Sequence, residues 1–213
     1  MEIEAKFRIA DVEVFERLLA LEALGAFGLG PVRVMQVHDA YLDTADRLIL
    51  AGGYSCRRRE YDNRVIITLK SVRKGEGPIH RREEYEVSLD ASVESPDDWP
   101  ESKVRDRVRE LIGAAPLGLL FEMNQTRHVR AVYAGDHSVA ELSLDRVQLS
   151  TDSRHLAYYE LEVELRDEGG ESDLLAIVAH LRNEWGLQAE SLSKFEQALV
   201  FIGSADMMPR NLD

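Results

Sequence analysis

Charged side chains of both signs recur at every second position along several segments of this 213-residue chain. Side chains alternate faces in a β-strand, so charges with this spacing share one face of their strand. Carboxylate oxygens are the ligands that Mg²⁺ and Mn²⁺ prefer, and lysine and arginine donate hydrogen bonds to phosphate. The acidic set comprises Glu2, Glu4, Asp145, Glu160, Glu162 and Glu164, with Glu84 and Glu86 at the same spacing, and the basic set comprises Lys6, Arg57, Arg59, Lys70, Arg127 and Lys194.

Each of these charges, taken alone, is more often a solvated surface residue than a ligand. Their recurrence in six predicted strands favours another arrangement, in which the sheet is rolled so that the charged faces point inward. Such a tunnel would bind a polyanion through its basic side and a metal ion through its acidic side. Phosphoryl transfer has this requirement, because it depends on positioning and charge neutralisation more than on a protein nucleophile.

Motifs for several other chemistries are missing from the sequence. There is no G-x-x-x-x-G-K-[ST] phosphate loop, and Lys74-Gly75-Glu76-Gly77 lacks both its spacing and its strand-to-helix context. The six histidines show no H-x-x-x-H spacing, which argues against a zinc site. No serine lies in a nucleophile elbow, and His38 is interpreted as a structural residue.

The strands that carry these charges are predicted from alternation with a period of two and from turn residues. Asp62-Asn63 suits the tight turn of a hairpin, and Gly135-Asp136 ends a long strand. The predicted strands span residues 1–7, 32–42, 54–61, 64–71, 80–89, 117–133, 138–149 and 157–166.

Helices are predicted between and after these strands. Asp11, Ser172 and Ser193 are predicted N-caps, and Asp43-Thr44 is predicted to cap a short helical turn. The predicted helices span about residues 11–26, 100–112, 172–185 and 193–200, and a polar loop at 73–78 and a turn at 151–154 lie between strands.

These elements predict an α+β fold built on an eight-stranded, antiparallel, closed β-barrel with flanking helices. The strands follow in hairpin order, without the strand–helix alternation of a parallel sheet. Closing the sheet removes exposed edge strands, and eight strands leave an interior that holds one small ligand. We expect one domain over residues 1–203 and a C-terminal tail over residues 204–213.

Composition limits the partners and the location that we expect. The formal net charge is −13, so the surface should repel nucleic acid and anionic membranes. The single cysteine, Cys56, excludes an internal disulfide and suits a reducing compartment. No apolar run reaches the ~18 residues of a membrane span, and the acidic N-terminus does not resemble a signal peptide. We therefore expect a cytoplasmic monomer or homodimer that binds neither nucleic acid nor membrane.

The order of the charged motifs resembles the CYTH superfamily, the triphosphate tunnel metalloenzymes. Glu2-Ile3-Glu4-Ala5-Lys6 is similar to the E-x-E-x-K motif of that superfamily. This motif alone is weak, but the match continues in order along nearly the whole chain. The further matching segments are residues 39–44, 57–59, 68–70, 82–86, 127, 145, 160–164 and 193–195.

The resemblance implies an eight-stranded antiparallel tunnel that binds a divalent metal, Mg²⁺ or Mn²⁺, and a small-molecule triphosphate. The implied catalytic residues are Lys6, Arg57, Arg59 and Arg127. The implied substrate contacts are Lys6, Arg57, Arg59, Lys70, Arg127, Lys194, Glu84 and Glu86. The implied metal ligands are Glu2, Glu4, Asp145, Glu160, Glu162 and Glu164, and the run at 160–164 aligns with a family pair in two registers that share Glu162.

The expected function is that of a hydrolase in which water attacks the terminal phosphorus of inorganic triphosphate, thiamine triphosphate or a nucleoside triphosphate. One alternative is a class IV-type adenylyl cyclase, which converts ATP to cAMP and pyrophosphate. Another is a non-catalytic binder of polyphosphate or nucleotide. The many carboxylates argue against the binder, because an anion site gains nothing from them unless metal is bound. No feature of the sequence separates hydrolase from cyclase.

Overall fold

The computed structural model describes residues 1–72, 79–90, 93, 95–151 and 154–203. The predicted loop at 73–78, the predicted tail at 204–213 and two residues of the predicted turn at 151–154 lie outside this part of the chain. The described strands are β1 (Glu2–Ile9), β2 (Ala23–Leu24), β3 (Phe27–Leu29), β4 (Arg33–Asp43), β5 (Tyr54–Tyr61), β6 (Arg64–Ser71), β7 (Ile79–Arg82), β8 (Glu84–Leu89), β9 (Gly118–Ala134), β10 (His137–Ser150), β11 (His155–Leu165) and β12 (Gln188–Ala189). The helices are α1 (Val12–Leu19), α2 (Leu48–Ala51), α3 (Lys103–Ile112), α4 (Glu171–Asn183) and α5 (Lys194–Ile202), with a 3₁₀ turn, η1, at Pro96–Asp98.

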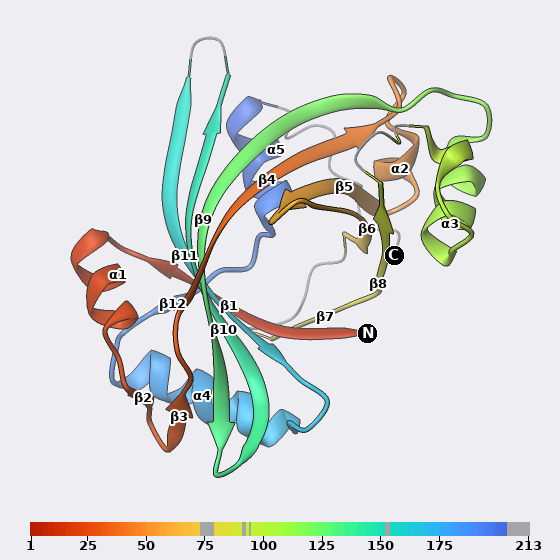
Figure 1. Ribbon diagram of the computed structural model, residues 1–213. Helices are drawn as coiled ribbons and strands as arrows, with labels where there is room; N and C mark the ends of the chain where they lie inside the picture. Colours follow the sequence, from red (N-terminus) through yellow and green to blue (C-terminus); the bar gives the residue numbers. More distant parts are fainter. Residues whose placement is uncertain (73–78, 91–92, 94, 152–153, 204–213) are drawn as a thin grey trace, which may run out of the picture.

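The strands form one curled antiparallel sheet in the order β12-β1-β11-β10-β9-β4-β5-β6-β8 (Figure 1). The segment that contains β7 and β8 bends at Glu83, whose backbone N–H donates to Ser71 Oγ at 3.1 Å. On one side of the bend β8 pairs with β6, and on the other side β7 pairs with β1, so this segment joins the two ends of the sheet. The predicted fold class, an α+β fold built on an antiparallel β-barrel with flanking helices, is therefore confirmed as a sheet that curls in the manner of a barrel, although its strand count differs.

The number of strands differs from the prediction, since the described residues form twelve strands and not eight. One reason is the bend at Glu83, which divides the strand predicted at 80–89 into β7 and β8. The others are the short strands β2, β3 and β12, which add edges to the main sheet. Seven strands and the bent β7–β8 segment thus form the ring, and together they correspond to the eight strands that were predicted.

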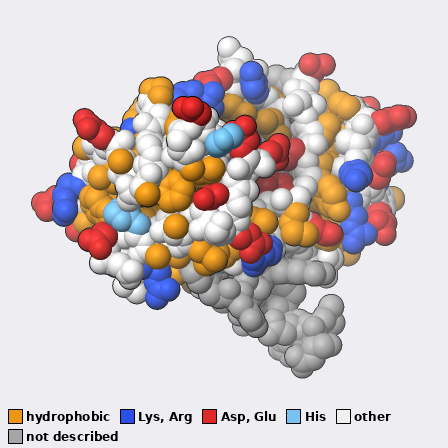
Figure 2. Space-filling model, turned by 90° about the horizontal axis from the view of Figure 1, so that it is seen from below, with side chains coloured by type: hydrophobic (Ala, Val, Ile, Leu, Met, Phe, Trp, Pro, Cys, Tyr) orange, Lys and Arg blue, Asp and Glu red, His pale blue; other side chains and the backbone are white. Residues whose placement is uncertain are grey.

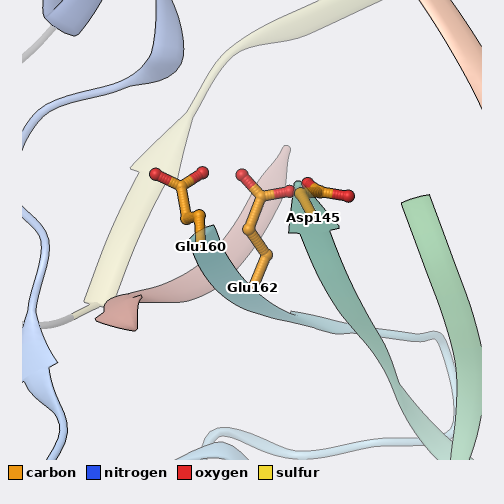
Figure 3. A group of neighbouring side chains, drawn as sticks. All are labelled: Asp145, Glu160 and Glu162. Carbon is orange, nitrogen blue, oxygen red and sulfur yellow. The ribbon is translucent and has the colours of Figure 1, made fainter. Parts of the chain in front are cut away.

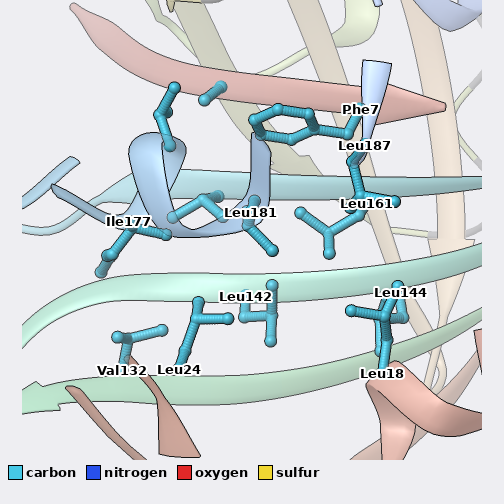
Figure 4. Close-up of a cluster of buried hydrophobic side chains, with 14 of the residues drawn as sticks. Phe7, Leu18, Leu24, Val132, Leu142, Leu144, Leu161, Ile177, Leu181 and Leu187 are labelled. Atoms are coloured by element: carbon cyan, nitrogen blue, oxygen red, sulfur yellow. The ribbon is translucent and has the colours of Figure 1, made fainter. Parts of the chain in front are cut away.

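The outer face of the sheet is apolar, whereas the inner face carries the charged side chains together with an apolar region beneath α5. In β1, Ala5, Phe7 and Ile9 are buried in a cluster with side chains of α1 and α4. Figure 4 shows this cluster, in which Leu181 of α4 lies near Leu161 of β11. Each large apolar side chain buried there contributes about 1.5–3 kcal/mol to stability. Because the helices cover the outer face, the alternate side chains of each strand point inward.

Two further apolar clusters pack the remaining helices against the sheet. Helices α2 and α3 cover the outer face of β5, β6 and β8, where Val104 and Val108 of α3 pack with Ile67 of β6 and with Trp99. Helix α5 packs through its apolar side against β4, β9 and β10, and Phe195 lies 5.3 Å from the ring centre of Tyr41. Helix α5 thereby brings its first residues to the interior of the ring.

The first helix is shorter than predicted. Asp11 caps it as predicted, but α1 ends at Leu19 and does not reach Ala26. The residues that follow form the β2–β3 hairpin, in which Gly25 adopts the left-handed conformation with φ +65°. Arg130 of β9 donates to the carbonyl oxygen of Leu19 at 3.4 Å and to further carbonyl groups of this region. These distant contacts end a helical pattern that the local sequence would have continued.

The predicted hairpin is present, and Asp43 and Thr44 accept hydrogen bonds from α2 as a cap would, although the N-cap residue itself is Arg47. Asp62 and Asn63 have φ values of 47° and 60°, as a two-residue turn of the primed type requires. The carboxylate of Asp43 accepts hydrogen bonds from Thr44 N at 2.7 Å and from Ile49 N at 2.9 Å. It therefore holds the first turn of α2 against the end of β4.

The last two helices differ in how well their starts were predicted. Ser193 caps α5 as predicted, with Glu196 completing a reciprocal capping box. Helix α4 starts at Glu171 with Gly170 as its N-cap, so the prediction that Ser172 caps it was wrong. The backbone N–H of Gly170 donates to the carboxylate of Asp173 at 2.9 Å, which allows the helix to begin earlier.

Candidate active site

The inner face of the sheet encloses a cavity of about 320 Å³. Side chains from β1, from β4 to β11 and from the start of α5 form its wall. Every residue of the predicted site lines this cavity except Asp145 and Glu160, which are fully buried beside it. The predicted residues on the wall are Glu2, Glu4, Lys6, Arg57, Arg59, Lys70, Glu84, Glu86, Arg127, Glu162, Glu164 and Lys194.

Asp145, Glu160 and Glu162 form a cluster that we call the inner acidic trio. Each offers one carboxylate oxygen within 4.8 Å of the others, and Figure 3 shows the three carboxyl groups side by side on β10 and β11. The register explains this arrangement, because Asp145 lies opposite Glu160 and Glu162 follows two residues later on the same face. Carboxylates this close repel one another, so the trio requires positive charge nearby.

Two lysines supply part of this positive charge. Lys194 Nζ lies 2.5 Å from Glu160 Oε1 and 2.7 Å from Glu162 Oε1. The same atom lies 3.0 Å from Asp145 Oδ2. Lys6 Nζ lies 2.9 Å from Glu162 Oε1. Residues from the first strand and from the last helix therefore meet at one buried cluster.

Arg127 of β9 completes the neutralisation of the trio. It donates through Nε and Nη2 to the two oxygens of Asp145 at 2.8 and 2.6 Å, and Nη2 lies 2.5 Å from Glu162 Oε2. Burial opposes the ionised form of Glu162, but Lys194, Lys6 and Arg127 outweigh it and hold the pKa of this carboxyl well below its usual range. Three cations thus balance three carboxylates.

Asp39 of β4 orients the two arginines of β5. It is fully buried and accepts both hydrogen bonds of Arg59, and its Oδ2 lies 3.8 Å from Arg57 Nη1. Burial raises the pKa of Asp39, but Arg59 and Arg57 outweigh burial and lower the pKa to about 2. The ionised carboxylate keeps both guanidinium groups in place on the cavity wall.

A second acidic cluster, which we call the outer glutamates, lines the cavity itself. Glu4 of β1 lies directly opposite Glu164 of β11, and Glu164 lies opposite Glu141 of β10. Side chains at directly opposed positions on one face lie about 5 Å apart. The cluster comprises Glu2, Glu4, Glu84, Glu141 and Glu164.

The outer glutamates have fewer cations than carboxylates around them. The closest contacts join Lys70 to Glu2 (2.5 Å), Arg82 to Glu4 (3.6 Å) and Arg166 to Glu141 (2.8 Å) and Glu164 (3.1 Å). In their ionised forms, five carboxylates and three cations leave a surplus of negative charge, whereas the inner acidic trio is balanced. This difference favours the outer cluster over the inner one as the place for an additional cation.

The outer glutamates fit a divalent metal ion. Burial, followed by repulsion from Glu4 and Glu84, raises the pKa of Glu2 to about 8 although Lys70 opposes the shift. Burial also raises the pKa of Glu164 to about 7, with Glu84 adding to the shift. Among the described residues, Glu4 Oε1 has no hydrogen-bond partner. A hard divalent cation would favour the ionised forms and use these oxygens as ligands.

Arg82 of β7 is held in place by His80, which the sequence did not single out. His80 Nε2 lies 3.1 Å from the carbonyl oxygen of Glu190, and its Nδ1 lies 3.1 Å from Arg82 Nη2. A carbonyl only accepts and a guanidinium only donates, so His80 carries its proton on Nε2. Burial and the charge of Arg82 lower the pKa of His80, which keeps the ring neutral. Arg82 is therefore fixed beside Glu4.

Glu84 and Glu86, predicted as substrate contacts, lie on the wall as partners of other polar groups. Glu86 Oε1 accepts a hydrogen bond from Thr68 Oγ1 at 2.9 Å, and Arg57 Nη2 donates to the same hydroxyl at 3.3 Å. Glu84 Oε2 lies 3.9 Å from Lys70 Nζ. These carboxylates help to set the positions of two basic side chains in the cavity.

A model of the CYTH domain matches residues 1–195 of the chain. The chain belongs to the CYTH family.

Three solved structures share its fold. HpAC1 from Hippeastrum, described as a candidate adenylyl cyclase with a dominant triphosphatase activity, aligns with a TM-score of 0.68 and 23% identity over 95% of this chain and 96% of its own. A candidate adenylate cyclase from Bacillus halodurans has a TM-score of 0.62 and 20% identity, covering 93% and 96%. The PH1819 protein from Pyrococcus horikoshii has a TM-score of 0.57 and 19% identity, covering 94% and 99%.

Several polar residues of this CYTH domain were missed as site residues by the sequence analysis. Asp39 lies within a matching segment, and its place opposite Arg59 depends on how β4 and β5 pair. Arg82 shares a strand phase with Glu84, but its support by His80 depends on the chain near Glu190. The sequence indicated only which face of its strand each of these residues occupies, not which groups it contacts.

The surface of the CYTH domain is mixed in character on the side shown in Figure 2, where acidic, basic and apolar side chains are interspersed. The chain as a whole carries a formal net charge of −13. No helix among the described residues is both long enough and apolar enough to cross a membrane.

Proposed function

We propose that this CYTH domain is a metal-dependent hydrolase of a triphosphate-containing substrate, in which water attacks the terminal phosphorus. One observation carries the proposal: a single cavity holds buried arginines and lysines next to glutamates with surplus negative charge. A site for an anion alone has no use for surplus glutamates, and a site for a metal alone has no use for the arginines. A metal–triphosphate complex uses both.

The basic residues are proposed to hold the phosphate oxygens. Arg57, Arg59 and Arg127 have forked guanidinium groups that suit bidentate contacts, and Lys6 and Lys194 add point charges at the buried end. Burial opposes the charge on Arg57, but Asp39 and other groups outweigh it and raise its pKa, so Arg57 stays protonated. Fixed charges in such a site stabilise the charge that shifts during phosphoryl transfer.

The glutamates are proposed to hold the metal. Three of the outer glutamates, Glu2, Glu4 and Glu164, line the cavity and would serve as ligands for Mg²⁺ or Mn²⁺. The bound ion would neutralise charge on the phosphate oxygens. Burial disfavours the ionised form of Glu4, but Lys70 and other cations outweigh it and lower the pKa, so Glu4 is ready to bind a cation.

Cyclisation of ATP is the second candidate. The Hippeastrum neighbour is described both as a candidate adenylyl cyclase and as having a dominant triphosphatase activity. Because that description names triphosphatase activity as dominant, we prefer hydrolysis and keep cyclisation as the alternative. The two reactions differ in the nucleophile, water in one and the ribose 3′-hydroxyl in the other, so their products separate them.

The deciding experiment incubates the purified protein with inorganic triphosphate, ATP and thiamine triphosphate in the presence of Mg²⁺ or Mn²⁺ and identifies the products. Hydrolysis releases orthophosphate, whereas cyclisation releases cAMP and pyrophosphate. Glu4→Gln should lower kcat at least about 100-fold, because it removes charge from the proposed metal site. Glu184→Gln, at an exposed position, is the control.

Three outcomes would overturn the proposal. Normal turnover of Glu4→Gln at low metal concentration would remove Glu4 from the site. Cyclic AMP as the main product from ATP would make the protein a cyclase. Thermal stabilisation by triphosphate and metal without any product would make it a binding protein.

A further inference from the structure

One end of the cavity differs in chemistry from the rest of its wall. Met35, Tyr61, Ile66 and Val129 come from four different strands, β4, β5, β6 and β9, and all line the cavity. Met35 and Val129 belong to one apolar cluster, and Tyr61 packs against it. No sequence motif marks these residues, and the binding of phosphate or metal gives them no role. The other apolar residues on the cavity wall, Tyr41, Val72 and Phe195, belong to or pack against the cluster beneath α5. The apolar wall formed by Met35, Tyr61, Ile66 and Val129 therefore calls for a partner of its own.

The apolar wall lies next to the arginines. Ile66 is directly opposite Arg59 in the β5–β6 pair, and Tyr61 follows Arg59 by two residues on the same face of β5. Met35 is directly opposite Arg127 in the β4–β9 pair. A ligand whose phosphates contact Arg59 and Arg127 would thus place its next group against Met35, Tyr61 and Ile66.

Exposure shows which end of the cavity is open. The inner end is closed, since Asp145 and Glu160 are 0% exposed and Lys194 is 5% exposed. Tyr61 and Ile66 are half-buried, and Arg33, which lines the cavity beside Met35, is exposed. The Nη2 atom of Arg33 lies 2.7 Å from Met35 Sδ, so its guanidinium is close to the apolar wall. The apolar wall therefore lies at a side of the cavity that is open to solvent, and Glu141, Glu164 and Arg166 mark another open side.

We propose that the substrate is an organic triphosphate whose planar ring packs against Tyr61 and Met35 while its phosphate chain extends inward to Arg59, Arg127 and Lys194. This inference rests on the proposed function, because it takes the triphosphate site as given. Aromatic rings and methionine side chains make favourable contacts with planar groups, and the exposed Arg33 can stack on a ring or contact its polar edge. Inorganic triphosphate has no group that would use this wall.

The test compares the specificity of the wild-type protein and of Tyr61→Ala. Steady-state kcat/KM is measured with Mg²⁺ for inorganic triphosphate, ATP and thiamine triphosphate, and binding of the same three compounds is measured by calorimetry. We expect the ratio of kcat/KM for the better organic substrate to that for inorganic triphosphate to fall about tenfold in Tyr61→Ala, the size of one lost apolar contact.

Two further variants keep the result interpretable. Tyr61→Phe retains the ring and should retain the ratio, which separates loss of ring contact from loss of the hydroxyl. Val34→Ala removes an exposed side chain of β4 adjacent to Met35 and should leave the ratio unchanged. If Tyr61→Ala fails to fold, Met35→Ala supplies the same comparison from the neighbouring strand.

The outcomes separate this inference from the proposed function. If the protein hydrolyses inorganic triphosphate and binds neither ATP nor thiamine triphosphate more tightly than inorganic triphosphate, the inference is overturned and the proposed function stands. An unchanged ratio in Tyr61→Ala and Met35→Ala also overturns it. If none of the three compounds is bound with metal present, both the proposed function and the inference fail.

Discussion

Asp39 on β4 and Arg59 on β5 are joined by two parallel hydrogen bonds. Arg59 Nε donates to Asp39 Oδ1 at 2.7 Å, and Nη2 donates to Oδ2 at 2.8 Å. The two residues lie directly opposite each other in the sheet, and Asp39 is fully buried. Because a bidentate contact sets the plane of the guanidinium group, Arg59 presents the rest of its donors to the cavity in one orientation.

Replacing Asp39 by asparagine should weaken both stability and catalysis. The buried charge of Arg59 would lose its anionic partner, so we expect the free energy of unfolding to fall by about 3 kcal/mol. We expect kcat/KM for triphosphate to fall at least about tenfold, since Arg59 is no longer held in place. Chemical denaturation and steady-state kinetics measure the two effects. Asp136→Asn, at an exposed turn, is the control, and equal effects in both variants would contradict the role of Asp39.

The lowered pKa of Asp39 predicts that the protein loses stability in acid. This carboxylate has a pKa of about 2 in the folded protein, below the usual value of 3.8, so it stabilises the fold above pH 4. This contribution, about 2 kcal/mol, is lost as the pH falls from about 4 to about 2. Urea denaturation between pH 6 and pH 2 measures it. Asp39→Asn should show a shallower decline over this range, and an identical decline in the two proteins would argue that other groups cause the acid sensitivity.

Replacing Lys194 by methionine should disrupt the inner acidic trio. One cation that lies within 3.0 Å of three carboxylates would be lost, leaving two cations for three buried carboxylates. We expect a loss of about 3–5 kcal/mol in stability and a fall in kcat of at least about 100-fold. Thermal unfolding and kinetics test this. Lys103→Met, on an exposed helix position, should change neither, and a Lys194→Met protein with normal turnover would show that α5 does not contribute to the site.

His80 should act by positioning Arg82, and two substitutions separate this role from packing. His80→Asn can keep an acceptor near the place of Nδ1, whereas His80→Leu removes it. We expect His80→Leu to raise KM for triphosphate about five- to tenfold with a smaller change in kcat, and His80→Asn to retain most of the wild-type KM. If both variants show the same KM at equal thermal stability, Arg82 does not depend on the histidine.

The features that depend on neighbouring residues could be predicted from the sequence. Alternation of charge with a period of two identified the inward faces of β1, β5 and β11, because side chains of a strand must alternate. The turn at Asp62-Asn63 and the cap at Ser193 were likewise predicted, since both act on backbone groups within a few residues. These local signals, together with the order of the motifs, predicted the curled sheet and many of the charged residues on its wall, but not Arg82 or Glu141.

Which charges meet depends on how distant segments of the chain pair and pack. The register of β1, β11 and β10 places Glu164 opposite Glu4, while Glu160 is buried with Lys194 from a helix 34 residues away. Asp39 and Arg59 are 20 residues apart, and His80 reaches the carbonyl of Glu190 over 110 residues. The early end of α1 has the same origin, because Arg130 donates to the carbonyl oxygens of Leu19, the last residue of the helix, and of Leu21 just after it. Contacts between distant segments depend on how whole strands pair and pack, and this information is absent from the local pattern of any one strand.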